Sequence, residues 1–324
     1  MRVFVTGGAG YIGSHVAREL AVHCYDVVAY DNLSHGHREL AKNCEFIEGD
    51  LRDAGRLKSA LRGAHAVMHF AGLIAVGESV QKPREYFENN VLAGLGLLNA
   101  VQHAGIRYFV FSSTAAVYGN PAKVPITEDA PLQPVNPYGV SKLFFEQALE
   151  AYGRAYDLRY ASLRYFNAAG AHDSGELGEM HDPETHLIPN VLSAAAGLRP
   201  EVEIFGKDYP TPDGTCIRDY IHVSDLAQMH IRALERLVDG GESMAVNVGT
   251  GKGYSVEEVV ATAEVVTGRK IPRRYMPRRP GDPAILVADP SRAENLLGWR
   301  ATRSLQDIIG SAWKWVQRMP TPST

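Results

Sequence analysis

The sequence has few cysteines, and their spacing fits neither a disulfide framework nor a thiolate metal site. Its 324 residues include only Cys24, Cys44 and Cys216, an odd number without Cys-x-x-Cys spacing. Such a set predicts reduced, buried thiols in a reducing compartment. We therefore expect no disulfide and no metal site.

Long apolar runs and a strong charge of either sign are also missing. No apolar run approaches the roughly 20 residues that a membrane-spanning helix needs. The first expected strand, Arg2–Thr6, stands where a signal peptide would have to be. The formal net charge is −4 with both signs mixed along the chain, which argues against nucleic acid as the main partner. We therefore expect a soluble, cytoplasmic protein with neither a membrane nor nucleic acid as its partner.

What the chain does have is a run of spaced glycines directly after the apolar residues Met1–Val5. Gly7 allows a tight turn, Gly10 lets the backbone approach a pyrophosphate, and Gly13 lets the next helix pack close to the strand. The free N–H groups at the start of that helix would face the anion. The second expected strand ends near Asp31, about 20 residues on, where the ribose of NAD meets an acidic side chain. This context predicts an NAD site rather than a structural turn, and Asp31 favours NAD over NADP.

Strands and helices alternate through the first half of the chain, which predicts a parallel sheet with helices on both faces. The expected strands are Arg2–Thr6, Asp26–Tyr30, Glu45–Glu48, Ala66–His69, Tyr108–Ser112 and Arg159–Leu163. The expected helices are Ser14–Val22, Gly55–Leu61, Pro83–Ala104 and Tyr138–Tyr156. Ligands of such sheets bind beyond the carboxyl ends of the strands.

The composition changes after Asn167, where Gly, Pro and Asp become frequent. We expect a doubly wound parallel sheet, a Rossmann domain, over residues 1–166. Residues 167–324 are expected to form mainly a smaller C-terminal α/β lobe that binds substrate. Helices are expected at Val223–Leu237 and Val256–Val266, and a strand at Ala245–Val248 could return to the main sheet.

The second strong motif is Asn136–Lys142, in which Pro137 favours the start of a helix. Tyr138 and Lys142 then lie at i and i+4 on one helical face. A neighbouring ammonium stabilises a phenolate, which brings the phenol from its ordinary pKa of about 10 toward a useful range. Of the 15 tyrosines only Tyr138 has Lys at this spacing. We interpret the pair as catalytic rather than as part of a helix surface.

Three hydroxyl side chains, Ser112, Ser113 and Thr114, follow at the end of the fifth expected strand. A hydroxyl there could hydrogen-bond a substrate hydroxyl and help its proton reach Tyr138. The alternative is a serine-threonine turn that caps the strand. Position favours Thr114, with Ser112 and Ser113 as possible substitutes.

With further segments, these motifs resemble the extended short-chain dehydrogenase/reductase family, and within it the UDP-sugar 4-epimerases. The resemblance runs nearly end to end. It rests on Gly7–Gly13, His69–Gly72, Val76–Ser79, Ser112–Gly119, Asn136–Lys142, Arg164–Asn167, Arg218–Val223, Asp225–Ala227 and Arg278–Asp282. The segments Val76–Ser79 and Arg218–Ala227 are the ones more specific to the epimerases.

The resemblance implies a reversible oxidation at C4 that interconverts UDP-glucose and UDP-galactose. Tyr138 would remove the C4 hydroxyl proton while NAD accepts the hydride, and Thr114 would steady the sugar hydroxyl. Lys142 would orient the nicotinamide ribose and lower the pKa of Tyr138. The transient 4-keto sugar would then turn over in the pocket, which requires NAD to stay tightly bound.

The resemblance also implies the binding residues. Those for NAD are Gly7, Gly10, Tyr11, Ile12, Gly13, Asp31, Asn32, Asp50, Leu51, Phe70, Ala71, Gly72, Asn89, Tyr138, Lys142 and Phe166. Those for the UDP-sugar are Asn167, Leu187, Phe205, Arg218, Tyr220, Arg279 and Asp282. Arginine suits this role because its planar fork pairs with phosphate oxygens, although on the residues alone each arginine fits a surface salt bridge equally well.

Two departures from the family pattern bear on ligand binding. Ile74 stands where many members carry a lysine near the cofactor phosphates, which removes one charged contact. Leu286 stands near the C2 substituent of the sugar, where members have either a bulky or a small residue. An epimerase of UDP-GlcNAc and UDP-GalNAc, or of a UDP-pentose or UDP-uronic acid, therefore stays open as an alternative.

Two other functions share much of this pattern. A nucleotide-sugar 4,6-dehydratase needs acid and base groups where this chain has Ala115 and Ala116, which cannot transfer protons. A non-catalytic NAD-binding regulator would typically lose the tyrosine or the lysine that this chain keeps. The helices expected at Pro83–Ala104 and Tyr138–Tyr156 carry apolar residues on more than one face, including Phe144 and Phe145. As in the family, they predict a homodimer, with packing against the sheet as the alternative.

Overall fold

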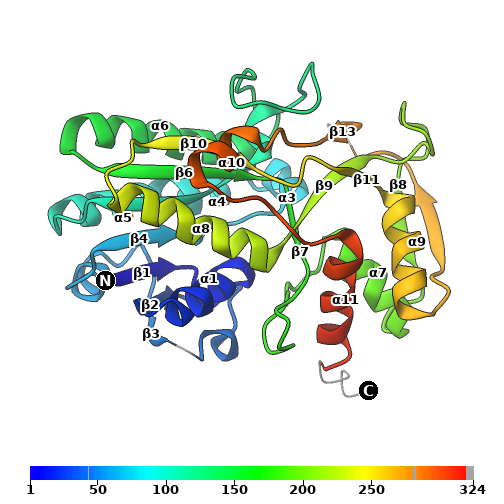
Figure 1. The fold of residues 1–324 in the computed structure, drawn as a ribbon, viewed down its shortest axis with the longest axis horizontal. Coiled ribbons are helices and arrows are strands. Elements are labelled where there is room, and N and C mark those ends of the chain that lie inside the picture. The colour runs from blue at the N-terminus through cyan, green and yellow to red at the C-terminus, as the bar shows by residue number, and fades with distance from the viewer. Residues whose placement is uncertain (43, 280–281, 319–324) are drawn as a thin grey trace.

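The computed structural model describes residues 1–42, 44–279 and 282–318, and its main feature is a seven-stranded parallel sheet (Figure 1). The strand order is β10-β6-β5-β4-β1-β2-β3. The strands are β1 (Arg2–Thr6), β2 (Asp26–Asp31), β3 (Glu45–Glu48), β4 (Ala66–His69), β5 (Tyr108–Thr114), β6 (Arg159–Tyr165) and β10 (Met244–Val248). The order reverses between β1 and β4, which is the switch point where doubly wound sheets bind ligands. The predicted fold class is confirmed.

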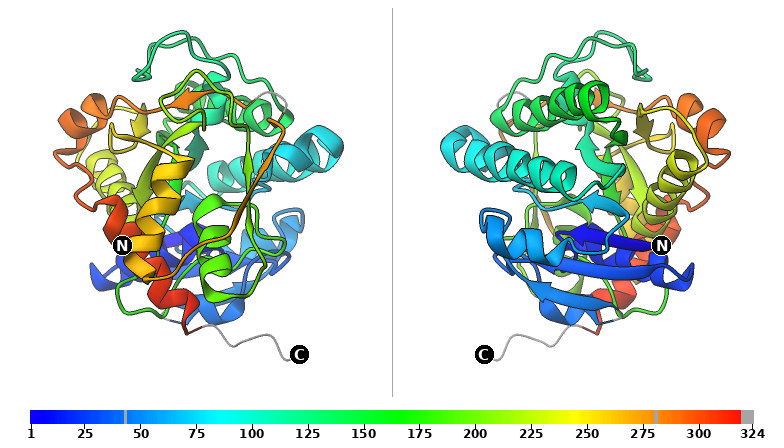
Figure 2. Two further views of the ribbon diagram at one scale, coloured as in Figure 1. Left: turned by 90° about the vertical axis from the view of Figure 1, so that its right-hand side faces the viewer. Right: turned by 90° about the vertical axis from the view of Figure 1, so that its left-hand side faces the viewer.

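Helices cover both faces of this sheet, as Figure 2 shows. Val3 and Val5 of β1 pack against α1 (Tyr11–Val22) and α8 (Val223–Val238). The intervening Phe4 points to the other face, because side chains alternate along a strand. That face is covered by α2 (Ala54–Ala60), α5 (Ala93–His103) and α6 (Pro137–Tyr156).

Some predicted bounds change for local reasons. Helix α1 begins at Tyr11, three residues before the expected Ser14, with Gly10 as its N-cap. Strands β5 and β6 each run two residues further than expected, because Ser113 and Thr114 pair in register with Arg164 and Tyr165.

The helix expected at Pro83–Ala104 is built from three segments. It consists of α4 (Pro83–Tyr86), the π-helical η2 (Phe87–Leu92) and α5, and it follows the short helix α3 (Val76–Gln81). Within η2, Asn90 is buried and bonds the backbone of Leu73. A π segment inside an α-helix often lies at a functional site. Because Asn90 bonds a loop far away in the sequence, periodicity did not predict this segment.

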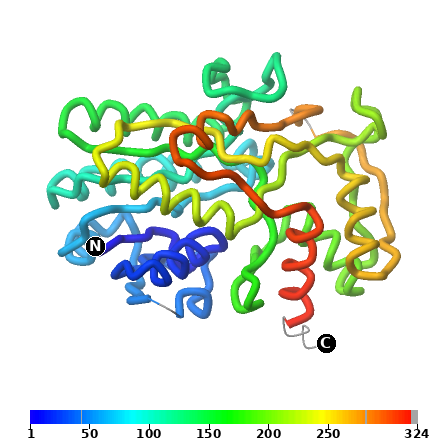
Figure 3. Tube along the Cα trace, viewed as in Figure 1, coloured from blue at the N-terminus to red at the C-terminus, as the bar shows by residue number. Residues whose placement is uncertain are grey.

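A smaller part follows β6 and lies on the right of Figure 1. Its strands are β7 (Asn167–Ala169), β8 (Val202–Phe205), β9 (Ile217–His222), β11 (Gly253–Ser255), β12 (Arg273–Met276) and β13 (Ile285–Leu286). Its helices are α7 (Leu187–Ala196), α9 (Val256–Thr267) and α11 (Leu305–Val316), which share one hydrophobic core. The chain crosses between the two parts more than once, and α8, β10 and α10 (Ser291–Leu297) pack on the main sheet (Figure 3).

One expectation about side-chain burial is wrong. The thiols of Cys24 and Cys44 are not buried as predicted: Cys24 is exposed in the turn after α1 and Cys44 is half-buried, whereas Cys216 is buried. Phe144 and Phe145 lie on different faces of α6, since Phe144 is 45% exposed and Phe145 is only 1% exposed and packs against Phe111 in the core. All three cysteines are free.

The helices offer no candidate for a membrane span. Among the described residues, no helix is both long enough and apolar enough to cross a bilayer.

A buried ion pair fastens α6 to the main sheet. Glu146 of α6 and Arg164 of β6 meet at 2.6 Å, with side chains 7% and 6% exposed. The hydroxyl of Ser113 on β5 also donates to Glu146. Arg164 Nη1 donates to the Tyr118 hydroxyl at 3.0 Å, and that hydroxyl donates to Asn247 of β10 at 2.7 Å. The network thus ties α6, β5, β6 and β10 together.

Breaking this ion pair tests its contribution to stability. Glu146→Gln leaves the guanidinium of Arg164 buried beside a neutral amide, so we expect the free energy of unfolding to fall by about 3–5 kcal/mol. Chemical denaturation followed by circular dichroism measures the change. The control, Glu150→Gln, removes the exposed partner of Arg154 on the same helix and should cost less than about 1 kcal/mol. Equal losses in the two variants would contradict the assignment.

Candidate active site

The glycine turn after β1 has the geometry that a phosphate site needs. Gly7 has a φ of +69°, and a Cβ there would come within 2.6 Å of the Ala71 nitrogen. A Cβ at Gly13 would lie 2.1 Å from the Gly7 oxygen, so α1 packs against the turn itself rather than against the strand as predicted. A Cβ at Gly10 would meet only that same oxygen, at 3.2 Å, and is otherwise in open space. The turn is therefore packed on one side and open at Gly10.

The N-terminus of α1 faces this opening. Gly10 is the N-cap, so no side chain caps the first N–H groups, and the first turn has no acidic residue. Such an end carries a partial positive charge and suits an anion. The side chains next in sequence are engaged elsewhere: the Tyr11 hydroxyl donates to the Gly170 oxygen at 2.7 Å, and Ile12 packs in the core. Only the backbone of these two residues is free to meet a phosphate.

Asp31, at the end of β2, is held by backbone groups. Its two oxygens accept from the Ala9 nitrogen at 3.0 Å and the Leu33 nitrogen at 2.8 Å. Burial raises the pKa of Asp31, and these two hydrogen bonds oppose the shift. A Cβ at Gly36 would lie 2.8 Å from the carboxylate, so the neighbouring loop closes over it. Because each carboxylate oxygen accepts more than one hydrogen bond, both can still bind hydroxyl groups.

Next to it, Asn32 and Asp50 are joined. Asn32 Nδ2 donates to Asp50 Oδ2 at 2.8 Å, and Arg52 pairs with the same carboxylate at 2.6 Å. The Arg52 side chain holds the pKa of Asp50 well below its ordinary value. Leu51 packs against the core on the α5 side of the sheet. The structure thus brings these predicted residues to the carboxyl ends of β2 and β3.

The segment after β4 connects the glycine turn to α6. The ring of Phe70 packs against His230 at 4.8 Å between centroids. A Cβ at Gly72 would lie 3.5 Å from Lys142 Nζ and 3.2 Å from Asn90 Oδ1. Gly72 therefore lets the chain pass close to the lysine ammonium.

Asn90 is a residue that the sequence analysis missed, beside the predicted Asn89. Its amide accepts from the Leu73 nitrogen at 2.8 Å and donates to the Leu73 oxygen at 2.9 Å and to Ser141 at 3.1 Å. Asn89 donates to Asn90 at 3.1 Å. Two asparagines inside an apolar helix are poor helix formers, and this was the available sequence signal.

Tyr138 and Lys142 lie one turn apart on α6. The helix begins where expected, because Asn136 accepts from the Gly139 nitrogen at 2.9 Å and Pro137 occupies the first turn. Both side chains are buried, and Lys142 Nζ lies 5.9 Å from the Tyr138 ring centroid. The ammonium donates to the Ser112 carbonyl at 2.9 Å.

In the protein without cofactor, burial is the largest cause of the pKa shifts of both Tyr138 and Lys142. It lowers the pKa of Lys142 to about 8. It raises the pKa of Tyr138, and an interaction with the Thr114 hydroxyl opposes this shift. In the protein without cofactor, burial thus sets the direction of the Tyr138 pKa shift, and the Lys142 ammonium is directed to the Ser112 carbonyl.

The three hydroxyls at the end of β5 have different partners. Ser112 Oγ pairs with the Tyr165 hydroxyl, and Ser113 Oγ donates to Glu146. Thr114 Oγ1 accepts from the Ala116 nitrogen at 3.1 Å, which leaves its proton free to be donated. Of the three, Thr114 is the hydroxyl that opposes the rise in the pKa of Tyr138.

The residues expected to bind substrate meet in pairs across the smaller part. Arg218 and Asp282 form an ion pair at 2.5 Å. The guanidinium of Arg279 lies 4.0 Å over the ring centroid of Phe205. Asn167 of β7 stands in register with Tyr220 of β9, where burial raises the pKa of the phenol. Pro280 and Gly281 of the same motif lie outside the described residues.

Three further residues frame this region. Leu187 is the first residue of α7 and packs against the hydrophobic core of the smaller part. Phe166 and Leu286 pack against the same apolar cluster around Tyr118, and Leu286 stands in register with Arg218. Ile74, the departure near the expected cofactor phosphates, is 40% exposed.

Comparison with known proteins agrees with this geometry. The NAD dependent epimerase/dehydratase family matches residues 3–249. A UDP-glucose 4-epimerase of Rhizobium leguminosarum bv. trifolii is 51% identical over 315 residues, covering 97% of this chain and 96% of that protein.

Solved structures are similar over nearly the whole chain. The UDP-glucose 4-epimerase of Brucella ovis in complex with NAD is 48% identical, with a TM-score of 0.94 and coverage of 96% and 97% of the two chains. That of Bifidobacterium longum in complex with NAD+ and UDP is 42% identical, with a TM-score of 0.93 and 99% coverage of both chains. The chain therefore belongs to the UDP-glucose 4-epimerases of the NAD-dependent epimerase/dehydratase family.

Proposed function

We propose that this chain interconverts UDP-glucose and UDP-galactose by inverting C4 of the sugar, with NAD as its bound cofactor. The observation that carries the proposal is the buried pair Tyr138 and Lys142. This pair lies beside the loop that follows β4, and the same loop contacts the glycine turn. Relatives with the same fold were solved with NAD and with UDP, which supports the same ligands here.

The carboxyl edge of the sheet fits NAD. The opening at Gly10 and the uncapped start of α1 suit the pyrophosphate, and Asp31 suits the hydroxyls of the adenosine ribose and repels a 2′-phosphate. The other residues proposed to line this groove are Gly7, Tyr11, Ile12, Gly13, Asn32, Asp50, Leu51, Phe70, Ala71, Gly72, Asn89 and Phe166. When bound, NAD supplies the redox chemistry by taking a hydride from C4 of the sugar and returning it.

Tyr138 moves the proton. Its phenolate accepts the C4 hydroxyl proton, and the phenol returns that proton once C4 is reduced again. Because burial raises the pKa of Tyr138, the phenolate needs positive charge nearby, which Lys142 and a cationic nicotinamide would provide. Thr114 donates a hydrogen bond that steadies the sugar hydroxyl or the phenolate.

The smaller part is proposed to hold the UDP group while the sugar turns. The ion pair with Asp282 orients the guanidinium of Arg218, and the ring of Phe205 orients that of Arg279. Both guanidinium groups are therefore in position before a diphosphate binds. Asn167, Leu187 and Tyr220 complete the proposed pocket. UDP must be bound firmly and the sugar loosely, because the sugar has to turn and present both of its faces to the cofactor.

We also propose a homodimer in the cytoplasm. Phe87, Leu92, Val140 and Phe144 of η2 and α6 are between 38% and 63% exposed, which supports an apolar face on these helices. The three free thiols support a reducing compartment.

The activity is tested directly with UDP-galactose and no added NAD. We expect conversion to a mixture containing UDP-glucose, resolved by chromatography, and a loss of about 10²- to 10⁴-fold in kcat for Tyr138→Phe. The control is Tyr152→Phe on the same helix. It removes a hydroxyl that bonds Asn99, and it should keep full activity. Failure of the wild type to convert the sugar even with NAD supplied would contradict the proposal.

We expect the buried ammonium of Lys142 to lower the stability of the folded protein, although the residue is needed for activity. The unfolded chain binds more protons at Lys142 than the folded one between pH 8 and 10.5, so this group's contribution to stability rises with pH across that window. Lys142→Met in nucleotide-free protein should leave stability at pH 7 unchanged or about 1–4 kcal/mol higher, while activity is lost.

Thermal unfolding as a function of pH measures this effect. The difference between Lys142→Met and the wild type should be largest below pH 8 and shrink toward pH 10.5. Lys58→Met, an exposed position on α2, should show no such pH dependence. A clearly less stable Lys142→Met protein at pH 7 would contradict the account.

The dimer is tested by sedimentation. The wild type should run as two chains, and the double variant Leu92→Asp, Phe144→Asp should run as one, because it buries two carboxylates in an apolar face. Val265→Asp, at an 81% exposed position of α9, is the control and should remain dimeric. A monomeric wild type would refute this proposal.

A further inference from the structure

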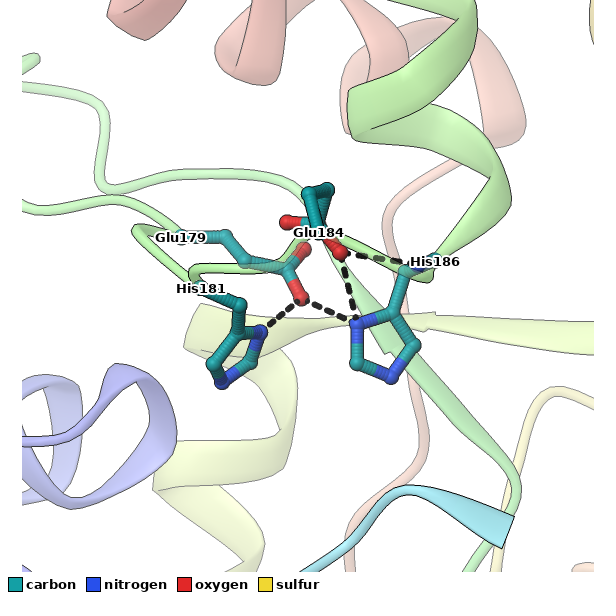
Figure 4. Close-up of side chains that lie close together, drawn as sticks. All are labelled: Glu179, His181, Glu184 and His186. Atoms are coloured by element: carbon teal, nitrogen blue, oxygen red, sulfur yellow. Dashed lines mark hydrogen bonds and ion pairs between the residues drawn. The ribbon is translucent and has the colours of Figure 1, made fainter. Parts of the chain in front are cut away.

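Four side chains that the proposed reaction does not use converge in the segment between β7 and α7. They are Glu179, His181, Glu184 and His186, spaced Glu-x-His-x-x-Glu-x-His in the sequence. All four point toward one another in Figure 4. One nitrogen or oxygen atom of each lies within 4.8 Å of the corresponding atoms of the other three.

The distances show how closely the donor atoms approach. Glu179 Oε1 lies 2.9 Å from His181 Nδ1 and 2.7 Å from His186 Nδ1. Glu184 Oε1 lies 3.2 Å from His186 Nδ1. The carboxylates of Glu179 and Glu184 thus both face His186 Nδ1, and the imidazole of His181 faces the Glu179 carboxylate.

The nitrogen at the centre of this cluster lacks a regular hydrogen bond. His186 Nδ1 is buried, although 38% of the side chain is exposed, and its contacts with Glu179 and Glu184 do not have hydrogen-bond geometry. Glu179 is itself only 8% exposed. A buried nitrogen that meets two carboxylate oxygens at ion-pair distance, but without hydrogen-bond geometry, suits a cation placed between these atoms.

The charge balance points the same way. Among the residues that the structure describes, no lysine or arginine lies within ion-pair distance of Glu179 or Glu184. Two carboxylates would then share two imidazoles as their ion-pair partners.

We propose that Glu179, His181, Glu184 and His186 bind a divalent transition-metal ion of the zinc type. Two imidazole nitrogens and two carboxylate oxygens are a donor set that Zn²⁺ accepts in tetrahedral geometry. Bonds of about 2.0–2.1 Å to such an ion separate neighbouring donor atoms by about 3.3 Å. The three distances above need to open by only a few tenths of an ångström. Four protein ligands complete the coordination, so the site is structural.

The four side chains lie on one long loop, and the position of this loop indicates what a bound ion would do. Residues 170–186 form no helix or strand, and they run between α1 and α11. Tyr11 of α1 bonds Gly170, and Trp315 of α11 donates to the backbone carbonyl of Glu179 at 3.0 Å. Helix α7 begins directly after His186. A metal would fasten this long loop to itself and fix the start of α7, which contributes free energy to folding.

The expectation of no metal site rested on cysteine spacing alone. The spacing Glu-x-His-x-x-Glu-x-His matches none of the common zinc spacings. The proposal does not depend on the proposed activity, since metal binding is measured without any sugar.

Titration of the full-length protein with metal alone tests the site. Protein freed of metal by a chelator is titrated with Co²⁺, whose visible absorption reports tetrahedral coordination, and Zn²⁺ is then added to displace it. We expect one ion per chain and a Zn²⁺-dependent rise in melting temperature. His181→Asn and His186→Gln should each weaken binding by at least about 10-fold and abolish the rise.

Matched controls come from the same loop. His172→Asn removes a histidine whose Nδ1 contacts Ser174, and Glu176→Gln removes an exposed partner of Arg18. Both should bind metal as the wild type does. The proposal fails if the wild type binds neither Co²⁺ nor Zn²⁺ at equimolar concentration, or if the two cluster variants bind like the controls. The stoichiometry of the wild type decides the question even if a cluster variant folds poorly.

Discussion

The proposed active site depends on one buried positive charge, the ammonium of Lys142. It can be buried because the Ser112 carbonyl accepts its hydrogen bond, and burial still lowers its pKa to about 8. Helix α6 must therefore be held firmly against the sheet. Glu146, one turn further along α6, provides that attachment through its ion pair with Arg164 of β6 and its hydrogen bond from Ser113 of β5.

The rest of the site follows from the switch point of the sheet. The order reverses between β1 and β4, so the glycine turn after β1 and the loop after β4 lie side by side. Gly72 then brings that loop to within contact distance of Lys142, and Tyr11 reaches across to Gly170 at the start of the long loop before α7. The glycine turn, helix α6 and the smaller part are thereby joined through contacts of these side chains with the backbone.

Much of this was predictable from sequence, because local patterns determine it. The bounds of β1, β3 and β4 agree with the prediction, and for β1 and β4 the reason is that buried parallel strands are short apolar runs between turns. Long-range contacts were not predictable: β5 extends to Thr114 through its pairing with β6, and the π segment depends on Asn90 bonding Leu73. The motif predicted Tyr138 beside Lys142, but not that the ammonium bonds Ser112 instead of the phenol.

The central claim is that C4 of the sugar loses and regains the same hydrogen as hydride. UDP-galactose carrying deuterium at C4 tests it, with the product analysed by mass spectrometry and NMR after conversion in ordinary water. The account predicts UDP-glucose that retains the deuterium at C4, because the hydride stays within the site while Tyr138 exchanges only the hydroxyl proton. UDP-glucose with solvent hydrogen at C4 would contradict it, since inversion would then proceed by loss of a proton from carbon.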